Sequence, residues 1–187
     1  LDSNYNWDCY FKSLGYNASL ILNEQNSTRT GAWGSSAFTT TTFNTQENYS
    51  STNGQPYIYY CWTSIKGYSK IGKYEGNGNA DGTFIYTGFK PAYFICKPHA
   101  ATDNWVVFDN KRNNAKNSST SPYFHYANKN FSETTDTKLI DFVSNGIKIR
   151  SSGNTVNRSG NFVYMAFAEH PFVSSAGISF SAWTAIS

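Results

Sequence analysis

The loop formed by residues 77–82 carries a spacing of oxygen atoms that could bind a metal ion. Asn77, Asn79 and Asp81 alternate along the backbone and precede a glycine, as the ligands of a calcium loop do. The loop supplies one carboxylate, however, and Gly88 stands where a glutamate would complete the coordination. The pattern therefore favours a chain reversal built on asparagine and glycine, with calcium as the alternative and no other cofactor expected.

Two regions combine aromatic rings with amide or carboxylate groups, which together suit the recognition of a sugar. Tyrosine and asparagine in loops are equally typical of protein–protein interfaces, so the residue types leave both kinds of ligand open. The first region contains Tyr68, Tyr74, Asn77, Asn79 and Asp81, and the second contains Tyr123, His125, Tyr126 and Asn128.

The acidic residues do not suggest a hydrolase. Cleavage of a glycosidic bond needs two carboxylates about 5 to 10 Å apart in one cleft. No strand with closely spaced acids is present, and the following acids stand singly in turns or at expected strand ends: Glu75, Asp109, Asp141 and Glu169. We therefore expect a protein that is not an enzyme, with a polysaccharide-cleaving enzyme as the least favoured hypothesis.

The histidines and cysteines give no catalytic or metal pattern either. His99, His125 and His170 are far apart and have no neighbouring serine or cysteine nucleophile. Cys96 and His99 have the spacing of zinc ligands, but a coincidence at the end of a strand explains it better. We expect no metal site from these residues.

Trp105, Asp109 and Arg112 could serve function or structure. The structural interpretation, which we favour, makes Trp105 a core ring and pairs Asp109 with Arg112 to hold the loop that leaves the strand.

Composition limits the remaining function classes. The 187 residues suit one domain, and a net charge of +3 with scattered basic residues argues against a nucleic-acid partner. No apolar run could cross a membrane, and the initial Leu1 indicates a cut boundary within a longer protein. Cys9, Cys61 and Cys96 are expected to be buried thiols, which indicates folding in a reducing compartment.

Short extended runs separated by glycine and asparagine predict an all-β fold with little or no helix. Residues 57–62 are apolar almost throughout, which predicts a buried strand, and the next runs should pair antiparallel. The fold expected is one antiparallel β-sandwich of the jelly-roll or concanavalin-like type over residues 1–187. The further expected strands lie at residues 84–87, 92–97, 105–109, 138–143, 146–150 and 160–168 and within 171–187, and the run at 71–74 is too short to classify by itself.

Five motifs in order resemble a known family. They are YCWTSIKGYSKIGKYEGNG (60–78), DGTFIYTGFKP (81–91), WVVFDNKR (105–112), DFVSNG (141–146) and YMAFAEHPF (164–172). The chain is similar to a domain of unknown function that is widespread in tailed bacteriophages, especially marine ones. That domain occurs in large virion proteins such as tail-fibre-like chains.

The resemblance implies a concanavalin-like or SPRY-like sandwich and offers no catalytic residues to transfer. It leads us to expect a virion protein, made in the host cytoplasm, that binds a host cell-surface glycan from a fibre or the capsid surface. The alternative is an architectural role in capsid decoration or fibre assembly, with other virion proteins as partners. A homo-oligomer is expected, a trimer by analogy with phage fibres.

Overall fold

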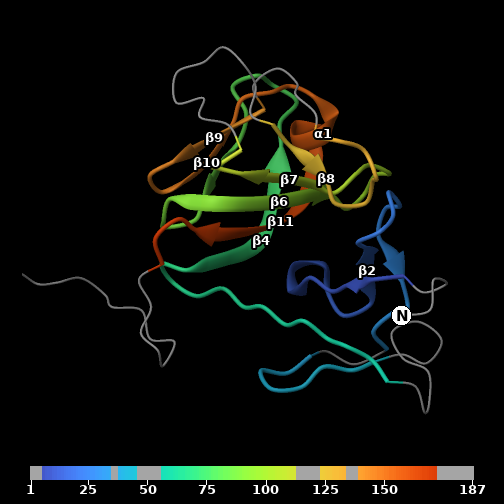
Figure 1. Cartoon of the computed structure of the whole chain (residues 1–187). Coiled ribbons are helices and arrows are strands. Elements are labelled where there is room, and N and C mark those ends of the chain that lie inside the picture. The colour runs from blue at the N-terminus through green and yellow to red at the C-terminus, as the bar shows by residue number, and fades with distance from the viewer. Residues whose placement is uncertain (1–5, 35–37, 46–55, 113–122, 134–138, 172–187) are drawn as a thin grey trace, which may run out of the picture.

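The computed structural model describes residues 6–34, 38–45, 56–112, 123–133 and 139–171, and these ranges form an all-β fold (Figure 1). Helical structure in these ranges is limited to the 3-10 turn η1 (Lys12–Leu14) and the single-turn helix α1 (Asn154–Asn157). The strands are β1 (Asp8–Cys9), β2 (Ala18–Ile21), β3 (Arg29–Thr30), β4 (Ser69–Gly76), β5 (Phe84–Tyr86), β6 (Pro91–Pro98), β7 (Val106–Asp109), β8 (His125–Tyr126), β9 (Ile140–Val143), β10 (Gly146–Ile149) and β11 (Gly160–Ala168).

The strands form three sheets whose pairings are all antiparallel. A five-stranded sheet has the order β4-β11-β6-β7-β8, a three-stranded sheet has the order β5-β10-β9, and a small N-terminal sheet has the order β1-β2-β3. The antiparallel sense expected for residues 57–97 is confirmed. Successive strands there are nevertheless not each other's partners, because β5 lies in the other sheet and β11 separates β4 from β6.

The main core lies between the five-stranded and three-stranded sheets, so the predicted β-sandwich is confirmed. Tyr74, Phe94 and Phe162 project from the larger sheet, and Ile147 and Ile149 project from the smaller one. Tyr74 stacks on Phe162 with ring centroids 4.8 Å apart. Aromatic burial of this kind dominates the stability of the interior.

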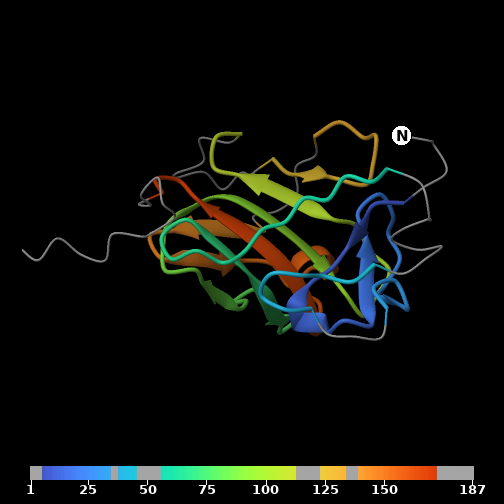
Figure 2. The ribbon, with the colours of Figure 1, turned by 90° about the horizontal axis from the view of Figure 1, so that it is seen from below.

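A second core lies on the outer face of the five-stranded sheet, where the N-terminal sheet covers one end of it (Figures 1 and 2). Phe11, Leu20 and Val163 are buried there with Trp105. The indole nitrogen of Trp105 donates a hydrogen bond to the backbone oxygen of Ile21 over 2.8 Å. Trp105 is therefore the core ring that we expected.

Residues 57–62 are not a strand of any sheet, so this prediction was wrong. They run in an extended path away from the start of β4 and along the N-terminal part of the chain (Figures 1 and 2). Tyr60 and Trp62 are largely exposed. An apolar run indicates that a segment is buried, but it does not indicate whether the segment packs against its own chain or against another molecule.

The cysteine prediction was partly wrong for the same reason. All three thiols are free, Cys96 is buried and Cys9 is half-buried, but Cys61 is exposed in the segment just described. Burial raises the pKa of Cys9 and of Cys96 to about 12, so neither is a reactive thiol near neutral pH. The strand expected within residues 171–187 lies almost wholly outside the described residues.

Candidate functional site

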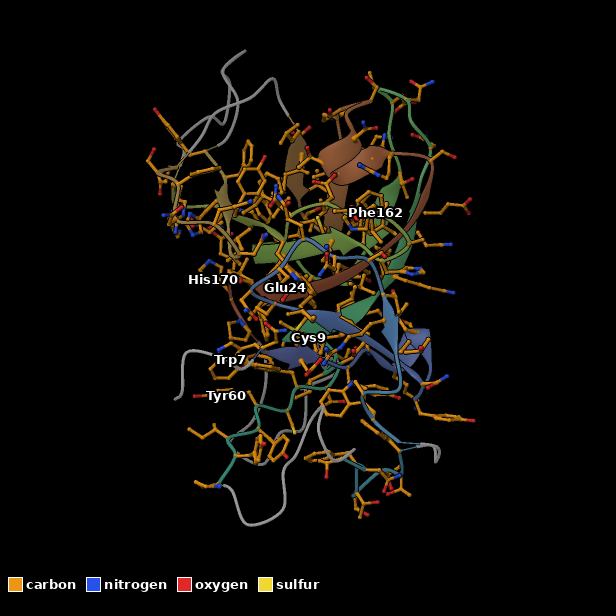
Figure 3. The ribbon with its side chains drawn as sticks, turned by 90° about the vertical axis from the view of Figure 1, so that its right-hand side faces the viewer. Trp7, Cys9, Glu24, Tyr60, Phe162 and His170 are labelled. Carbon is orange, nitrogen blue, oxygen red and sulfur yellow. The ribbon has the colours of Figure 1, made fainter. Side chains whose placement is uncertain are left out.

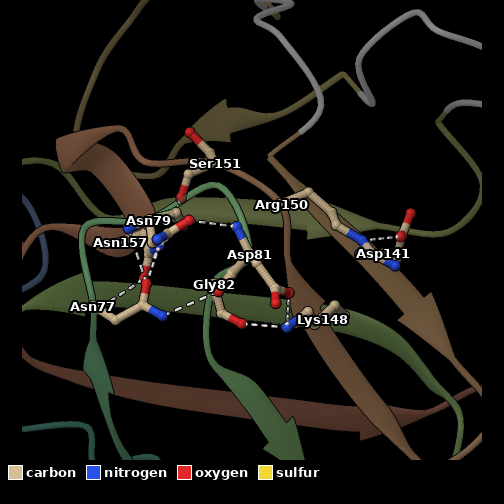
Figure 4. A network of polar contacts seen from close by, with 9 residues as sticks. All are labelled: Asn77, Asn79, Asp81, Gly82, Asp141, Lys148, Arg150, Ser151 and Asn157. Carbon is tan, nitrogen blue, oxygen red and sulfur yellow. Dashed lines mark hydrogen bonds and ion pairs between the residues drawn. The ribbon is translucent and has the colours of Figure 1, made fainter.

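The loop of residues 77–82 is a chain reversal closed by a buried asparagine on α1 (Figure 4). The side-chain amide of Asn157 donates hydrogen bonds to Asn77 Oδ1 over 2.9 Å and to the backbone oxygens of Asn79 and Ser151, each over 2.7 Å. Its side-chain oxygen accepts one from the backbone N–H of Asn77 over 3.0 Å. Gly78 has a φ of 64°, which asparagine or glycine tolerates best.

The carboxylate of this loop already has a cation beside it. Lys148 Nζ lies 2.7 Å from Asp81 Oδ1 and also donates a hydrogen bond to the backbone oxygen of Gly82 (Figure 4). The hydrogen bond from the Lys148 ammonium to the Asp81 carboxylate, helped by the charge of Lys148, lowers the pKa of that carboxyl. The ammonium opposes a second cation at this position by charge repulsion, and the hydrogen bonds show that the loop serves as a turn.

The first predicted sugar-binding set does not come together. Tyr68 lies before β4 and Asn77 after it, and an eight-residue strand separates its ends by about 25 Å. Tyr74 is not at the surface, where a binding residue was expected. It is buried in the main core, and its hydroxyl donates a hydrogen bond to the backbone oxygen of Val156 over 2.7 Å. Burial raises the pKa of Tyr74, and a ring enclosed in this way cannot stack on a sugar.

The second set is more accessible. Tyr123 is exposed, and His125 and Tyr126 are half-buried in β8. Asn128 follows β8, and its side chain accepts a hydrogen bond from the backbone N–H of Trp105 over 2.9 Å. Asn128 is also one of the residues that line the concavity described below.

Three of the four isolated acids, all but Glu75, are paired with bases rather than with one another. Arg112 forms an ion pair with Asp109, as expected. Asp141 lies 2.6 Å from Arg150, and Glu169 lies 2.6 Å from Lys90. The described residues contain no cluster of three histidine, cysteine or acidic side chains suited to a metal ion. In the same ranges, no helix has the length and apolar character needed to cross a membrane.

An open polar concavity of about 400 Å³ lies where three loops meet. The loop after β2, the β6–β7 loop and the turn after β8 each contribute to it. Its lining residues are Asn23, Glu24, Gln25, Asn26, Thr102, Asn128 and Lys129.

Shared hydrogen bonds hold these loops together. Asn104 Oδ1 accepts from Gln25 Nε2 over 2.7 Å and from Asn128 Nδ2 over 2.9 Å, so one amide joins two of the loops. The backbone N–H of Asp103 donates to the backbone oxygen of Gln25 over 2.9 Å. The concavity is thus a built feature and not a gap between independent loops.

A buried lysine holds two of the loops that form the concavity. Lys97 is fully buried on the outer face of β6, and its ammonium donates to the backbone oxygens of Gln25 over 2.9 Å and Asp103 over 2.5 Å. Burial lowers the pKa of Lys97 to about 8. The Asp103 carboxylate forms an ion pair with Arg158 over 2.8 Å, which anchors the loop a second time.

Several polar groups of the concavity have capacity for further hydrogen bonds. The Thr102 hydroxyl and the Lys129 ammonium make no hydrogen bond within the described ranges, and Glu24 uses one carboxylate oxygen to accept from Asn26. These lining residues were missed by the sequence reasoning, Asn128 apart. The unbroken polar run at residues 23–26 directly after a buried strand was the available signal.

The backbone of an exposed tryptophan contacts a lining residue of the concavity. The backbone N–H of Trp7 donates to Asn23 Oδ1 over 2.9 Å, which places this tryptophan next to the lining. The Trp7 ring stacks on Tyr60 with centroids 6.3 Å apart. Figure 3 shows the two rings side by side, with Glu24 above them in this view.

Comparisons with curated proteins and with solved structures find no match for the chain. A family model does match, and it covers residues 1–171, which include both cores and every residue of the concavity. The chain therefore belongs to the family of the domain of unknown function DUF7483.

Proposed function

We propose that this domain is a non-enzymatic attachment module of a tailed-phage virion, displayed on a fibre or on the capsid surface, and that it binds a host cell-surface glycan. The observation that carries the proposal is the concavity of about 400 Å³ with Trp7 at its border. The resemblance to virion domains and the rigid sandwich that holds variable loops support it.

The chemistry of the lining suits a sugar. Amide groups, one hydroxyl, the Glu24 carboxylate and the Lys129 ammonium offer both donors and acceptors to vicinal hydroxyls. The partly exposed Trp7 ring offers an apolar face for a pyranose ring. Opposite charges at Glu24 and Lys129 leave the lining without the positive excess that a phosphate backbone attracts.

The same lining favours binding without cleavage. Glu24 is the one carboxylate among the residues that line the concavity, and Asp103 nearby is paired with Arg158. Hydrolysis by an acid and a base, or by an acid and a nucleophile, needs two carboxyl groups at a fixed separation. We therefore propose that the glycan is held and released intact.

An architectural role is the second candidate, because residues 57–62 expose several aromatic rings. Exposed apolar area of this kind favours contact with protein, such as another virion chain. The two roles share Trp7, whose ring stacks on Tyr60, so Glu24 is the residue that tests the glycan role separately.

The test is binding of purified host-envelope polysaccharide by isothermal calorimetry, after a glycan array has identified a positive sample. Glu24→Gln and Trp7→Ala should each weaken binding at least tenfold, since each removes a contact worth about 1.4 kcal/mol or more. Tyr86→Ala is the matched control, because Tyr86 is an exposed ring on β5 in a different sheet.

A blank array, or equal weakening by all three variants, would contradict the attachment role. Release of reducing sugar ends that stops in Glu24→Gln would instead establish an enzyme. Either result is clear without knowledge of the particular glycan.

A further inference from the structure

Residues 57–62, together with Trp7 and Phe43, form an exposed surface that we call the aromatic strip. Its central segment belongs to none of the three sheets. Tyr60 and Trp62 are 63% and 57% exposed, and Ile58 is 58% exposed. Soluble proteins rarely leave so many large apolar side chains together in water unless another molecule covers them.

The segment has the side-chain alternation of a β-strand. The rings of Tyr57 and Tyr59 stack with centroids 6.3 Å apart, and those of Tyr60 and Trp62 stack at 6.0 Å. Both pairs are two residues apart, which is the repeat that places side chains on one face of an extended chain. The segment therefore carries a row of rings on each of two faces.

Neighbouring parts of the chain extend both rows. Trp7 stacks on Tyr60 at 6.3 Å, and Phe43 meets Tyr59 edge-on at 4.9 Å. Contacts between rings restrict the side chains before any partner arrives, which lowers the entropy cost of binding.

The strip carries no charge, whereas the nearby sheet edge does. No acidic or basic residue occurs from Pro56 to Ile65. By contrast β4, an edge strand of the five-stranded sheet, exposes Lys70 and Lys73. Lysines on an edge prevent pairing with another chain, so this protein protects one extended segment and leaves the adjacent one open.

The exposed area suits a weak contact between two copies. Taking about 200 Å² for each large side chain, the face that carries Ile58, Tyr60 and Trp62, extended by Trp7, exposes about 440 Å² per copy. Two copies would bury about 900 Å² together, which is the size of a weak, reversible interface.

We infer that the aromatic strip is a self-association surface whose occupant is the strip of a second copy of this chain. A neutral strip with similar rows on both faces is complementary to itself, and antiparallel placement of two such segments generates a closed two-fold pair. This pairing differs from the trimer expected by analogy, and it does not depend on the glycan proposal.

Cys61 provides a direct probe of this arrangement, because it is exposed in the middle of the strip while Cys9 and Cys96 are unreactive. In a two-fold antiparallel pair centred on Tyr60, the two Cys61 side chains point to the same face with their Cα atoms about 8 Å apart. A bis-maleimide of similar length should therefore link two wild-type chains into a covalent dimer.

The experiment combines this cross-linking with analytical ultracentrifugation of the whole chain up to about 100 µM. Wild type should form dimers in the ultracentrifuge and be cross-linked by the bis-maleimide. Cys61→Ser should form the same dimers in the ultracentrifuge but should not be cross-linked. Ile58→Lys should raise the dissociation constant at least tenfold, because two unpaired ammonium groups would meet in the contact.

Tyr86→Lys is the matched control, since Tyr86 is 64% exposed but lies on β5, away from the strip. It should leave dimerisation unchanged, and circular dichroism should show all variants folded. The inference is overturned by a wild-type monomer at every concentration, by a trimer, by a dimer that Ile58→Lys leaves intact, or by equal effects of the two lysine variants. A contact with a different virion protein or with a glycan, made by a strictly monomeric chain, would also overturn it.

Discussion

Replacing Asn157 by alanine tests whether the 77–82 loop is held as a structural turn. Asn157 is fully buried. The two N–H groups of its amide are shared among three acceptors, and its side-chain oxygen accepts one further hydrogen bond (Figure 4). Each such bond contributes about 1 kcal/mol, and partners left without a bond cost more. Since the loop can open to water and recover part of this loss, we expect destabilisation of about 3 kcal/mol.

The assay is equilibrium unfolding in urea followed by tryptophan fluorescence. With a denaturant slope of about 2 kcal/mol per molar, the midpoint for Asn157→Ala should fall by about 1.5 M. Asn130→Ala is the matched control, because Asn130 is exposed in a loop and should change stability by less than about 0.5 kcal/mol.

A loss below about 1 kcal/mol for Asn157→Ala would refute the reasoning, because removal of an enclosed amide that bonds the loop through both its nitrogen and its oxygen should cost more than one hydrogen bond. Calcium provides an independent check on the same loop. A ligand that binds the folded state raises the unfolding midpoint, so an unchanged midpoint in millimolar calcium is the expected result with Lys148 beside Asp81.

Three further predictions concern ionisation and close packing. Lys97 has a pKa of about 8 in the folded protein and 10.5 as its ordinary value, so the unfolded chain holds more protons between these values and stability should rise with pH. The measurement is the unfolding free energy of wild type minus that of Lys97→Met. This difference should increase by about 2 kcal/mol between about pH 7.5 and about pH 10. A difference that does not change with pH would contradict the burial of the ammonium. Glu169 has its pKa lowered to about 2, chiefly by a hydrogen bond from one of its two lysine partners, so its contribution is present above about pH 4.5 and lost as the pH falls toward 2. Acid titration should show this loss in wild type and not in Glu169→Gln, with a size below about 1 kcal/mol because solvent screens the group. Gly76→Ala would place a Cβ 2.2 Å from the backbone oxygen of Arg158, whereas Gly72→Ala would meet only the Tyr164 ring at 3.2 Å. The first change should lower stability by about 3 kcal/mol in thermal unfolding and the second by much less, and equal losses would count against this packing.

Local patterns predicted the strands that the chain builds from its own contacts. The 92–97 and 160–168 runs are rich in β-branched and aromatic residues between turn residues, and both appear as strands of the central sheet, β6 and β11. The Trp105 core ring and the Asp109–Arg112 pair were likewise predictable, because one is a large apolar ring in a strand and the other two residues are three positions apart.

Predictions that required knowledge of distant neighbours were less successful. Tyr74 follows a lysine and precedes a glutamate, so its exposure could not be decided until Phe162 was found stacked against it. Residues 57–62 were predicted to be a buried strand because their composition is apolar. In the described ranges β4 pairs with β11 on one side and with no sheet strand on the other, so the segment does not join the sheet although this edge is open. The concavity was missed since its lining comes from three loops that are distant along the chain. Gln25 and Asn104, which join two of them, are 79 residues apart, and Asn104 and Asn128 are 24 apart.

The sequence alone therefore determined the all-β class, most strand positions and the 77–82 turn, because these depend on side-chain type and on contacts within a few residues. Tertiary structure decided which rings are enclosed, which lie in water, and where polar loops converge over Lys97. The physical reason is that burial is a property of pairs of segments brought together by the sheets, and a single stretch of sequence does not specify its partner.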